Sequence, residues 1–99
     1  MLVHNVLFWL KKDLTEEEKK SFKEQLDTLK TIPCLGPVIT GTVADTEKRP
    51  VVEHSYDFGL TCVFTDKEEH DVYQIHDTHQ AFISNCAKYW EKVVVTDYD

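Results

Sequence analysis

The chain has 99 residues, of which 41% are hydrophobic and 11% aromatic, and its net charge at pH 7 is −7. A chain of this length folds as one domain, residues 1–99, around a single core. The acidic balance argues against nucleic acid as a partner, because phosphate binding needs clustered Lys and Arg. No run approaches the roughly 18 apolar residues of a membrane-spanning helix, so we expect no membrane partner either.

The three cysteines, Cys34, Cys62 and Cys86, are odd in number and widely spaced, with no CxxC pair. This usage suits reduced thiols better than a disulfide framework, and we interpret them as small buried hydrophobes. The apolar start of the chain carries His4 and Asn5 and no basic leader, which indicates a strand and not a signal peptide. These features together predict a cytoplasmic protein.

The first half of the chain predicts a strand, a helix and a second strand. Residues 2–10 are apolar on both alternating faces, which is typical of a strand covered on both sides. Thr15 and Glu18 have the spacing of a capping box, so a helix should begin at residue 16 and run to about 31, before Pro33. The β-branched residues of 38–43 predict the second strand.

The second half predicts a strand, a helical region and a final strand. Residues 56–64 alternate clearly between apolar and mixed positions. Asp66 and Glu69 repeat the capping-box spacing, so a helix should open near residue 67. We expect an interruption after Asp77-Thr78 and a helical end near Lys92, because Phe82, Cys86, Tyr89 and Trp90 fall three to four apart. Residues 93–98 form the last predicted strand.

The resulting order, β-α-β-β-α-β, is the ferredoxin-like pattern of the α+β class, an antiparallel four-stranded sheet with helices on one face. The other face of that sheet is left uncovered. Since the first strand is apolar on both sides, a second sheet should cover it, and a two-fold homodimer provides one.

The candidate site lies in the segment from Tyr73 to Phe82, which contains two histidines and a tyrosine, with His4 as a third partner. A neutral imidazole can act as a base near pH 7, so His79 is the candidate catalytic base. The Tyr73 phenol would stabilise a developing oxyanion, and His4 would orient the base or share a proton. The alternative is that all three are hydrogen-bonded interior residues without a catalytic role.

Large apolar side chains are first of all core residues, and some also line a cavity. The expected lining residues are Val6, Phe8, Phe22, Phe58, Phe82 and Trp90. His76 and His79 share an HxxH spacing with Asp77, Glu69 and Asp71 nearby, but a zinc site needs three or four convergent ligands. We therefore predict no metal and no cofactor.

Five segments together resemble the Dabb family, the stress-responsive dimeric A/B barrel domain. They are Val3-His4-Asn-Val-Leu-Phe8, Leu14-Thr-Glu-Glu-Glu18, Tyr56-Asp-Phe-Gly-Leu-Thr-Cys-Val-Phe64, Tyr73-Gln-Ile-His76-Asp-Thr-His79-Gln-Ala-Phe82 and Trp90-Glu-Lys-Val-Val-Val-Thr-Asp-Tyr98. The resemblance implies two ferredoxin-like subunits whose sheets face each other in a dimeric barrel.

A plant cyclase of that family closes a polyketide chain by an intramolecular aldol step, and its catalytic histidine, helix tyrosine and first-strand histidine match His79, Tyr73 and His4. Two departures stand out: Asp77 occupies a position where the family often has Pro, and Phe58 occupies one where the cyclase has a histidine.

The leading hypothesis is a homodimer that binds a small apolar or aromatic ligand. Each subunit would perform cofactor-free acid-base chemistry, cyclase- or isomerase-like, on a small carbonyl or aromatic compound. One alternative is a non-catalytic stress-associated or assembly protein with structural histidines. Another is a relative of the cofactor-free monooxygenase-like barrels.

Overall fold

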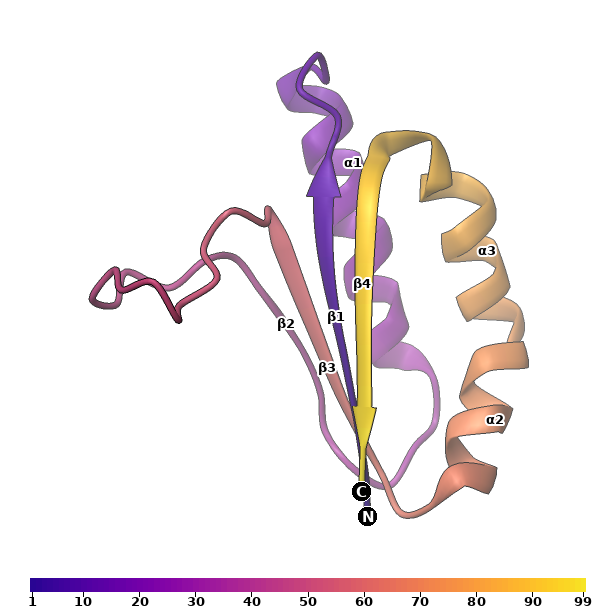
Figure 1. The fold of residues 1–99 in the computed structure, drawn as a ribbon. Coiled ribbons are helices and arrows are strands. Elements are labelled where there is room, and N and C mark those ends of the chain that lie inside the picture. The colour runs from indigo at the N-terminus through magenta and orange to yellow at the C-terminus, as the bar shows by residue number, and fades with distance from the viewer.

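A computed structural model describes all residues, 1–99, and Figure 1 shows its arrangement. The strands are β1 (Leu2–Leu10), β2 (Val38–Gly41), β3 (Phe58–Phe64) and β4 (Trp90–Tyr98). The helices are α1 (Glu16–Asp27), α2 (Lys67–Ile75) and α3 (Asp77–Cys86), with 3-10 turns η1 (Thr28–Thr31) and η2 (Ala87–Tyr89). No helix is long and apolar enough to cross a membrane.

The four strands form one sheet in the order β2-β3-β1-β4, and every neighbouring pair is antiparallel. This is the predicted ferredoxin-like topology, with β1 at the centre beside β3 and β4. The register places His4 of β1 opposite Cys62 of β3 and Asp97 of β4. Because side chains directly opposite share a face of the sheet, these three lie on the same side.

The first helix is capped as predicted. The Thr15 hydroxyl accepts from the Glu18 backbone N–H, and the Glu18 carboxylate accepts from the Thr15 N–H. Together α1 and η1 fill the predicted range of 16–31. Only one of the two hydrogen bonds of the second predicted capping box forms, in which the Asp66 side chain accepts from the Glu69 N–H. The Glu69 carboxylate instead accepts from the backbone N–H groups of Thr65 and Leu35. Glu69 therefore ties the loop before β2 to the start of α2.

The break between α2 and α3 falls at His76, slightly before the expected position. Its backbone is extended (φ −61°, ψ 141°), and its Nδ1 accepts a hydrogen bond from the Thr78 N–H at 3.1 Å. His76 thus caps α3, and Asp77 begins the helix, where its carboxylate favours the positive end of the helix dipole. His79 consequently lies in the first turn of α3.

The predicted helical end near Lys92 is wrong. Helix α3 ends at Cys86, and β4 already begins at Trp90, which pairs with Leu10. The Trp90 ring packs against Phe8 and Phe82, with centroids 5.5 and 5.9 Å away. The turn η2 continues the three-to-four spacing past the helix, so a helical pattern in the sequence overlaps the start of the strand. Strands β2 and β3 are shorter than predicted, with β2 ending at Gly41 and β3 beginning at Phe58, whereas β1 fills its predicted range of 2–10.

The two faces of the sheet differ. Alternate side chains of β1 and β3, such as Val6, Phe8 and Leu60, pack with Phe22 and Leu26 of α1 in one hydrophobic cluster. The opposite face has no helix and carries a shallow depression of about 450 Å³, lined by side chains of all four strands, among them Asn5, Leu7, Ile39, Thr61 and Val94. Ile39, on this face, is 56% exposed. The sheet therefore has one covered and one uncovered face, as the β-α-β-β-α-β order predicts.

Candidate functional site

A cavity of about 220 Å³ lies between the covered face of the sheet and helix α3. Three of its twelve lining residues are polar: His4, Gln74 and His79. The other nine are hydrophobic: Val6, Phe8, Leu29, Leu60, Phe82, Ile83, Trp90, Val93 and Val95. Because Ile83 and Val95 are also exposed, the cavity opens to solvent between α3 and β4. A small apolar pocket with convergent polar groups is typical of a ligand site.

His79 reaches this cavity from the first turn of α3 and is only 9% exposed. Its Nδ1 is buried and has no hydrogen-bond partner. Burial lowers the pKa of the His79 imidazole, because the charged form loses hydration, and the nearby His4 lowers it further. The ring is therefore held in its neutral, basic form at pH 7.

His4 enters the cavity from the middle of the sheet and is 3% exposed. Its Nδ1 lies 2.6 Å from Oδ1 of Asp97, the residue directly opposite on β4. This short contact fixes the orientation of the His4 ring. Asp97 was not among the predicted site residues, although alternation within the predicted last strand puts it on the same face as Val93 and Val95.

Tyr73 lies behind the cavity and does not line it. The side chain is fully buried, with its ring centroid 4.8 Å from that of His79 and 6.1 Å from that of His4. Burial, followed by the neighbouring Cys62 thiol, raises the pKa of the phenol, which therefore stays protonated. Its hydroxyl is buried and has no hydrogen-bond partner. Tyr73 thus supports the two imidazoles by packing, and its hydroxyl lies away from the cavity surface.

The predicted lining residues divide into two groups. Val6, Phe8, Phe82 and Trp90 line the cavity, whereas Phe22 and Phe58 do not. Phe22 has no exposed surface and lies 5.3 Å from Phe8 and 5.8 Å from Phe82, between centroids, so it forms the layer behind them. Phe58 packs against Phe22 in turn, at 5.3 Å. Phe22 of α1 belongs to the core cluster and Phe58 of β3 packs against that cluster, so neither ring reaches the cavity.

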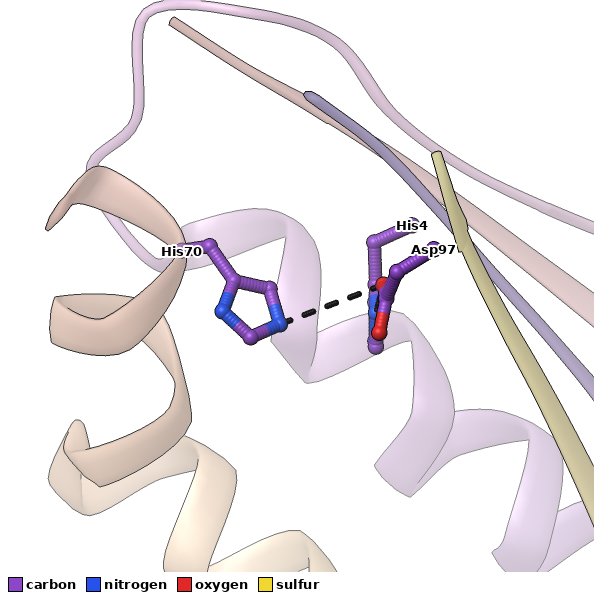
Figure 2. A group of neighbouring side chains, drawn as sticks. All are labelled: His4, His70 and Asp97. Carbon is purple, nitrogen blue, oxygen red and sulfur yellow. Dashed lines mark hydrogen bonds and ion pairs between the residues drawn. The ribbon is translucent and has the colours of Figure 1, made fainter. Parts of the chain in front are cut away.

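Two further polar residues near the cavity were not expected from the sequence. Gln74 lines the cavity, and His70, one turn before it on α2, lies with its Nε2 4.0 Å from Oδ1 of Asp97. His4, His70 and Asp97 form a group whose ligand atoms all lie within 4.8 Å of one another (Figure 2). His76, by contrast, is committed to capping α3, so the HxxH pair does not converge on one point.

A family model for the stress responsive A/B barrel domain, Dabb, matches residues 2–99. The chain belongs to the Dabb family. The resemblance of the five sequence segments is thereby confirmed over essentially the whole of this Dabb domain.

Solved structures share the fold of this Dabb domain. A dimeric ferredoxin-like protein of unknown function from Thermobifida fusca aligns with a TM-score of 0.77 at 20% identity, over 98% of this chain and 88% of that one. A dimeric protein of unknown function from Bacteroides fragilis gives 0.74 at 25% identity, over 99% and 94%. The hydroxynitrile lyase of Passiflora edulis gives 0.75 at 19% identity, over 98% and 90%. No curated protein matches this Dabb domain in sequence.

Proposed function

We propose that this protein is a homodimeric Dabb domain whose cavity binds a small carbonyl or aromatic compound and transfers a proton on it without a cofactor. The observation that carries the proposal is the convergence of two buried imidazoles, His4 and His79, on one otherwise apolar cavity. An acid-base reaction needs a group that accepts a proton near neutral pH, and imidazole meets that need.

His79 is the proposed base. Its lowered pKa keeps a lone pair available at pH 7, and its Nδ1 has no partner within the protein. A buried polar atom without a partner costs about 1–3 kcal/mol, so such an atom is retained more readily where a bound molecule can satisfy it. In the proposed step, the C–H bond beside a carbonyl breaks, its proton moves to the imidazole, and the electron pair moves toward the carbonyl oxygen as an enolate.

His4 is the proposed partner that shares this proton. With Nδ1–H donating to Asp97, the other ring nitrogen, Nε2, carries a lone pair, and the carboxylate stabilises the ring if it becomes protonated. The two imidazoles can therefore accept the proton and return it to another atom of the same substrate. Tyr73 acts in this proposal by holding both rings in place, and a catalytic hydroxyl would require its side chain to turn toward the cavity.

The size of the cavity limits the substrate. About 150 Å³ suffices for benzene, whereas drug-sized ligands need about 300 Å³ or more. A cavity of about 220 Å³ therefore suits a single ring or a short acyl chain. The wall contains no lysine or arginine side chain, so an uncharged carbonyl compound fits better than a phosphorylated or carboxylated one.

The dimer is proposed from the uncovered face of the sheet, where Leu7, Ile39 and Val94 surround a depression that no element of the chain fills. The proteins from Thermobifida fusca and Bacteroides fragilis, which share the fold, are both dimeric. The Passiflora edulis protein of the same fold is a hydroxynitrile lyase, so this fold hosts catalysis in at least one relative.

Exchange of carbonyl α-protons for deuterium tests the proposal without knowledge of the product. Small ketones and aldehydes, including aryl ketones, are incubated with the protein in D₂O and followed by NMR. We expect exchange with the wild type and its loss in His79→Gln, whereas His54→Gln, in the exposed loop before β3, serves as the control and retains it. Absence of wild-type exchange across the panel would favour the non-catalytic alternative with structural histidines.

A further inference from the structure

We propose that His4, His70 and Asp97 form a site for one divalent transition-metal ion of the zinc class. The three side chains come from three different elements: β1, α2 and β4. Figure 2 shows His70 reaching from the helix toward the pair formed by His4 and Asp97 on the strands. Two imidazoles and one carboxylate are ligands that Zn²⁺ uses in proteins.

The distances suit a shared ion after small side-chain movements. Tetrahedral zinc with bonds of about 2.0–2.1 Å keeps its ligand atoms about 3.3 Å apart. Here Oδ1 of Asp97 lies 2.6 Å from His4 Nδ1 and 4.0 Å from His70 Nε2. One of these distances is shorter and the other longer than the ideal, so a rotation of the Asp97 carboxylate brings both toward it.

The hydrogen bonds around the His70 ring favour a cation at this point. Its Nδ1 lies 3.1 Å from the Asp71 carboxylate, which can only accept, so the ring proton belongs on Nδ1 and Nε2 carries a lone pair. That lone pair is aimed toward the Asp97 carboxylate, and the Gln74 amide, 3.2 Å away, is the one donor at Nε2. A metal ion between Nε2 and Asp97 turns two facing acceptors into two ligands.

The side chains that contact these ligands are also arranged as at known metal centres. A ligating histidine usually donates its other ring nitrogen to a carboxylate, which orients the ring and increases its basicity. Asp71 provides that contact for His70, and is itself held by Lys67 at 2.6 Å. His4 is fixed by the sheet, where its backbone pairs on both sides.

The ion would have access to solvent. The Asp97 side chain is 42% exposed, and His70 is 15% exposed, so both ligands can be reached from the surface. Three protein ligands leave one position of a tetrahedral ion for water or another small molecule. Two imidazoles favour Zn²⁺, Co²⁺ or Ni²⁺ over Mg²⁺ and Ca²⁺, which prefer oxygen ligands.

This site goes beyond the proposed function and does not depend on it, because metal binding needs no substrate. The two are nevertheless linked through His4, which is both a ligand and part of the cavity wall. With an ion on Nδ1, the ring proton of His4 moves to Nε2, so the same residue would present a donor in place of an acceptor.

Zinc titration of the untagged, full-length chain, stripped of metal with a chelator, tests the site by calorimetry. We expect one Zn²⁺ per chain and at least about tenfold weaker binding in His70→Ala and Asp97→Asn. The control, His54→Ala, removes an exposed histidine outside the group and should bind as the wild type does. Circular dichroism checks that each variant is folded. If His70→Ala unfolds, the test rests on Asp97→Asn, which keeps the shape of the side chain.

Thermal unfolding gives a second measurement, because an ion that binds only the folded chain raises Tm. Zinc should raise the Tm of the wild type and of His54→Ala but not that of Asp97→Asn. Equal zinc affinity in the wild type, His70→Ala and Asp97→Asn would overturn the proposal, as would the absence of binding to the wild type. If the wild type binds zinc but catalyses no proton exchange, only the proposed function is contradicted.

Discussion

His4 and Asp97 face each other across the central and edge strands, and their Nδ1 and Oδ1 atoms lie 2.6 Å apart although 93 positions separate them in the chain. The pair joins the first strand to the last beside the cavity. Asp97→Asn keeps the shape but removes the carboxylate that orients His4. We expect about a 10- to 100-fold slower α-proton exchange, measured in EDTA so that no metal contributes.

The matched control for this prediction is Asp99→Asn, which makes the same substitution at an exposed aspartate two residues later. It should leave the exchange rate unchanged. Equal rates in Asp97→Asn and the wild type would show that His4 needs no orientation by the carboxylate.

The architecture was predictable from the sequence because its signals are local. Alternation marked β1 and β3, and the spacing of Thr15 and Glu18 marked the start of α1. The end of α3 was not predictable, because the helical spacing of Tyr89 and Trp90 continues through a 3-10 turn. Tertiary pairing of Trp90 with Leu10 decides the element there.

The site was predictable only in part. His4 and His79 stood out as ionisable groups in apolar surroundings, and both line the cavity. Asp97 depends on the register of β4 against β1, and His70 depends on which face of α2 meets the sheet. Neither register nor helix orientation can be deduced from a single segment, so the polar partners on other elements could not be predicted.

The stability of the protein should depend on pH through His79. Its pKa is lowered in the folded state by burial, whereas an unfolded histidine titrates near about 6.5. Below that pH the unfolded chain binds a proton that the folded protein resists, so the free energy of unfolding is highest above about pH 6.5 and falls as the pH is lowered toward the folded pKa. The slope from this one group cannot exceed about 1.4 kcal/mol per pH unit.

Urea unfolding at several pH values, again in EDTA, measures this slope. His79→Gln should reduce the loss of stability between about pH 6.5 and 5, whereas His54→Gln should not. A steeper slope in His79→Gln than in the wild type would contradict the assignment of a lowered pKa to His79.

Two neighbouring positions of β1 should respond differently to a negative charge. Val6 is buried on the helix-covered face, so Val6→Asp places an unpaired charge in the core and should lower the free energy of unfolding by about 3–5 kcal/mol. Leu7 faces the uncovered side of the sheet, so Leu7→Asp should leave the subunit folded and break the proposed dimer.

Light scattering and circular dichroism together separate these outcomes. Leu7→Asp should give the mass of one subunit with a native spectrum. A native dimer in Leu7→Asp would exclude this face of the sheet as the interface. Thr96→Asp, on the same face of edge strand β4, offers a second test of the interface.

Gly36 should resist substitution because the backbone of β3 passes against it. A Cβ added at this position would lie 2.0 Å from the carbonyl oxygen of Val63, a group fixed within the sheet. The neighbouring Pro37 carbonyl accepts from the Val63 N–H at 3.0 Å, so the loop cannot move away without losing that bond. Gly36→Ala should therefore lower the free energy of unfolding by at least about 2 kcal/mol.

Gly41 provides the matched control, since a Cβ there would meet nothing within 4 Å. Gly41→Ala lies at the end of β2 and should change stability by less than about 0.5 kcal/mol. Denaturant unfolding of the two variants measures the difference directly. Equal stability of the two variants would mean that the loop before β2 adjusts freely. The hydrogen bond from the Leu35 N–H to the Glu69 carboxylate would then have to shift with the loop.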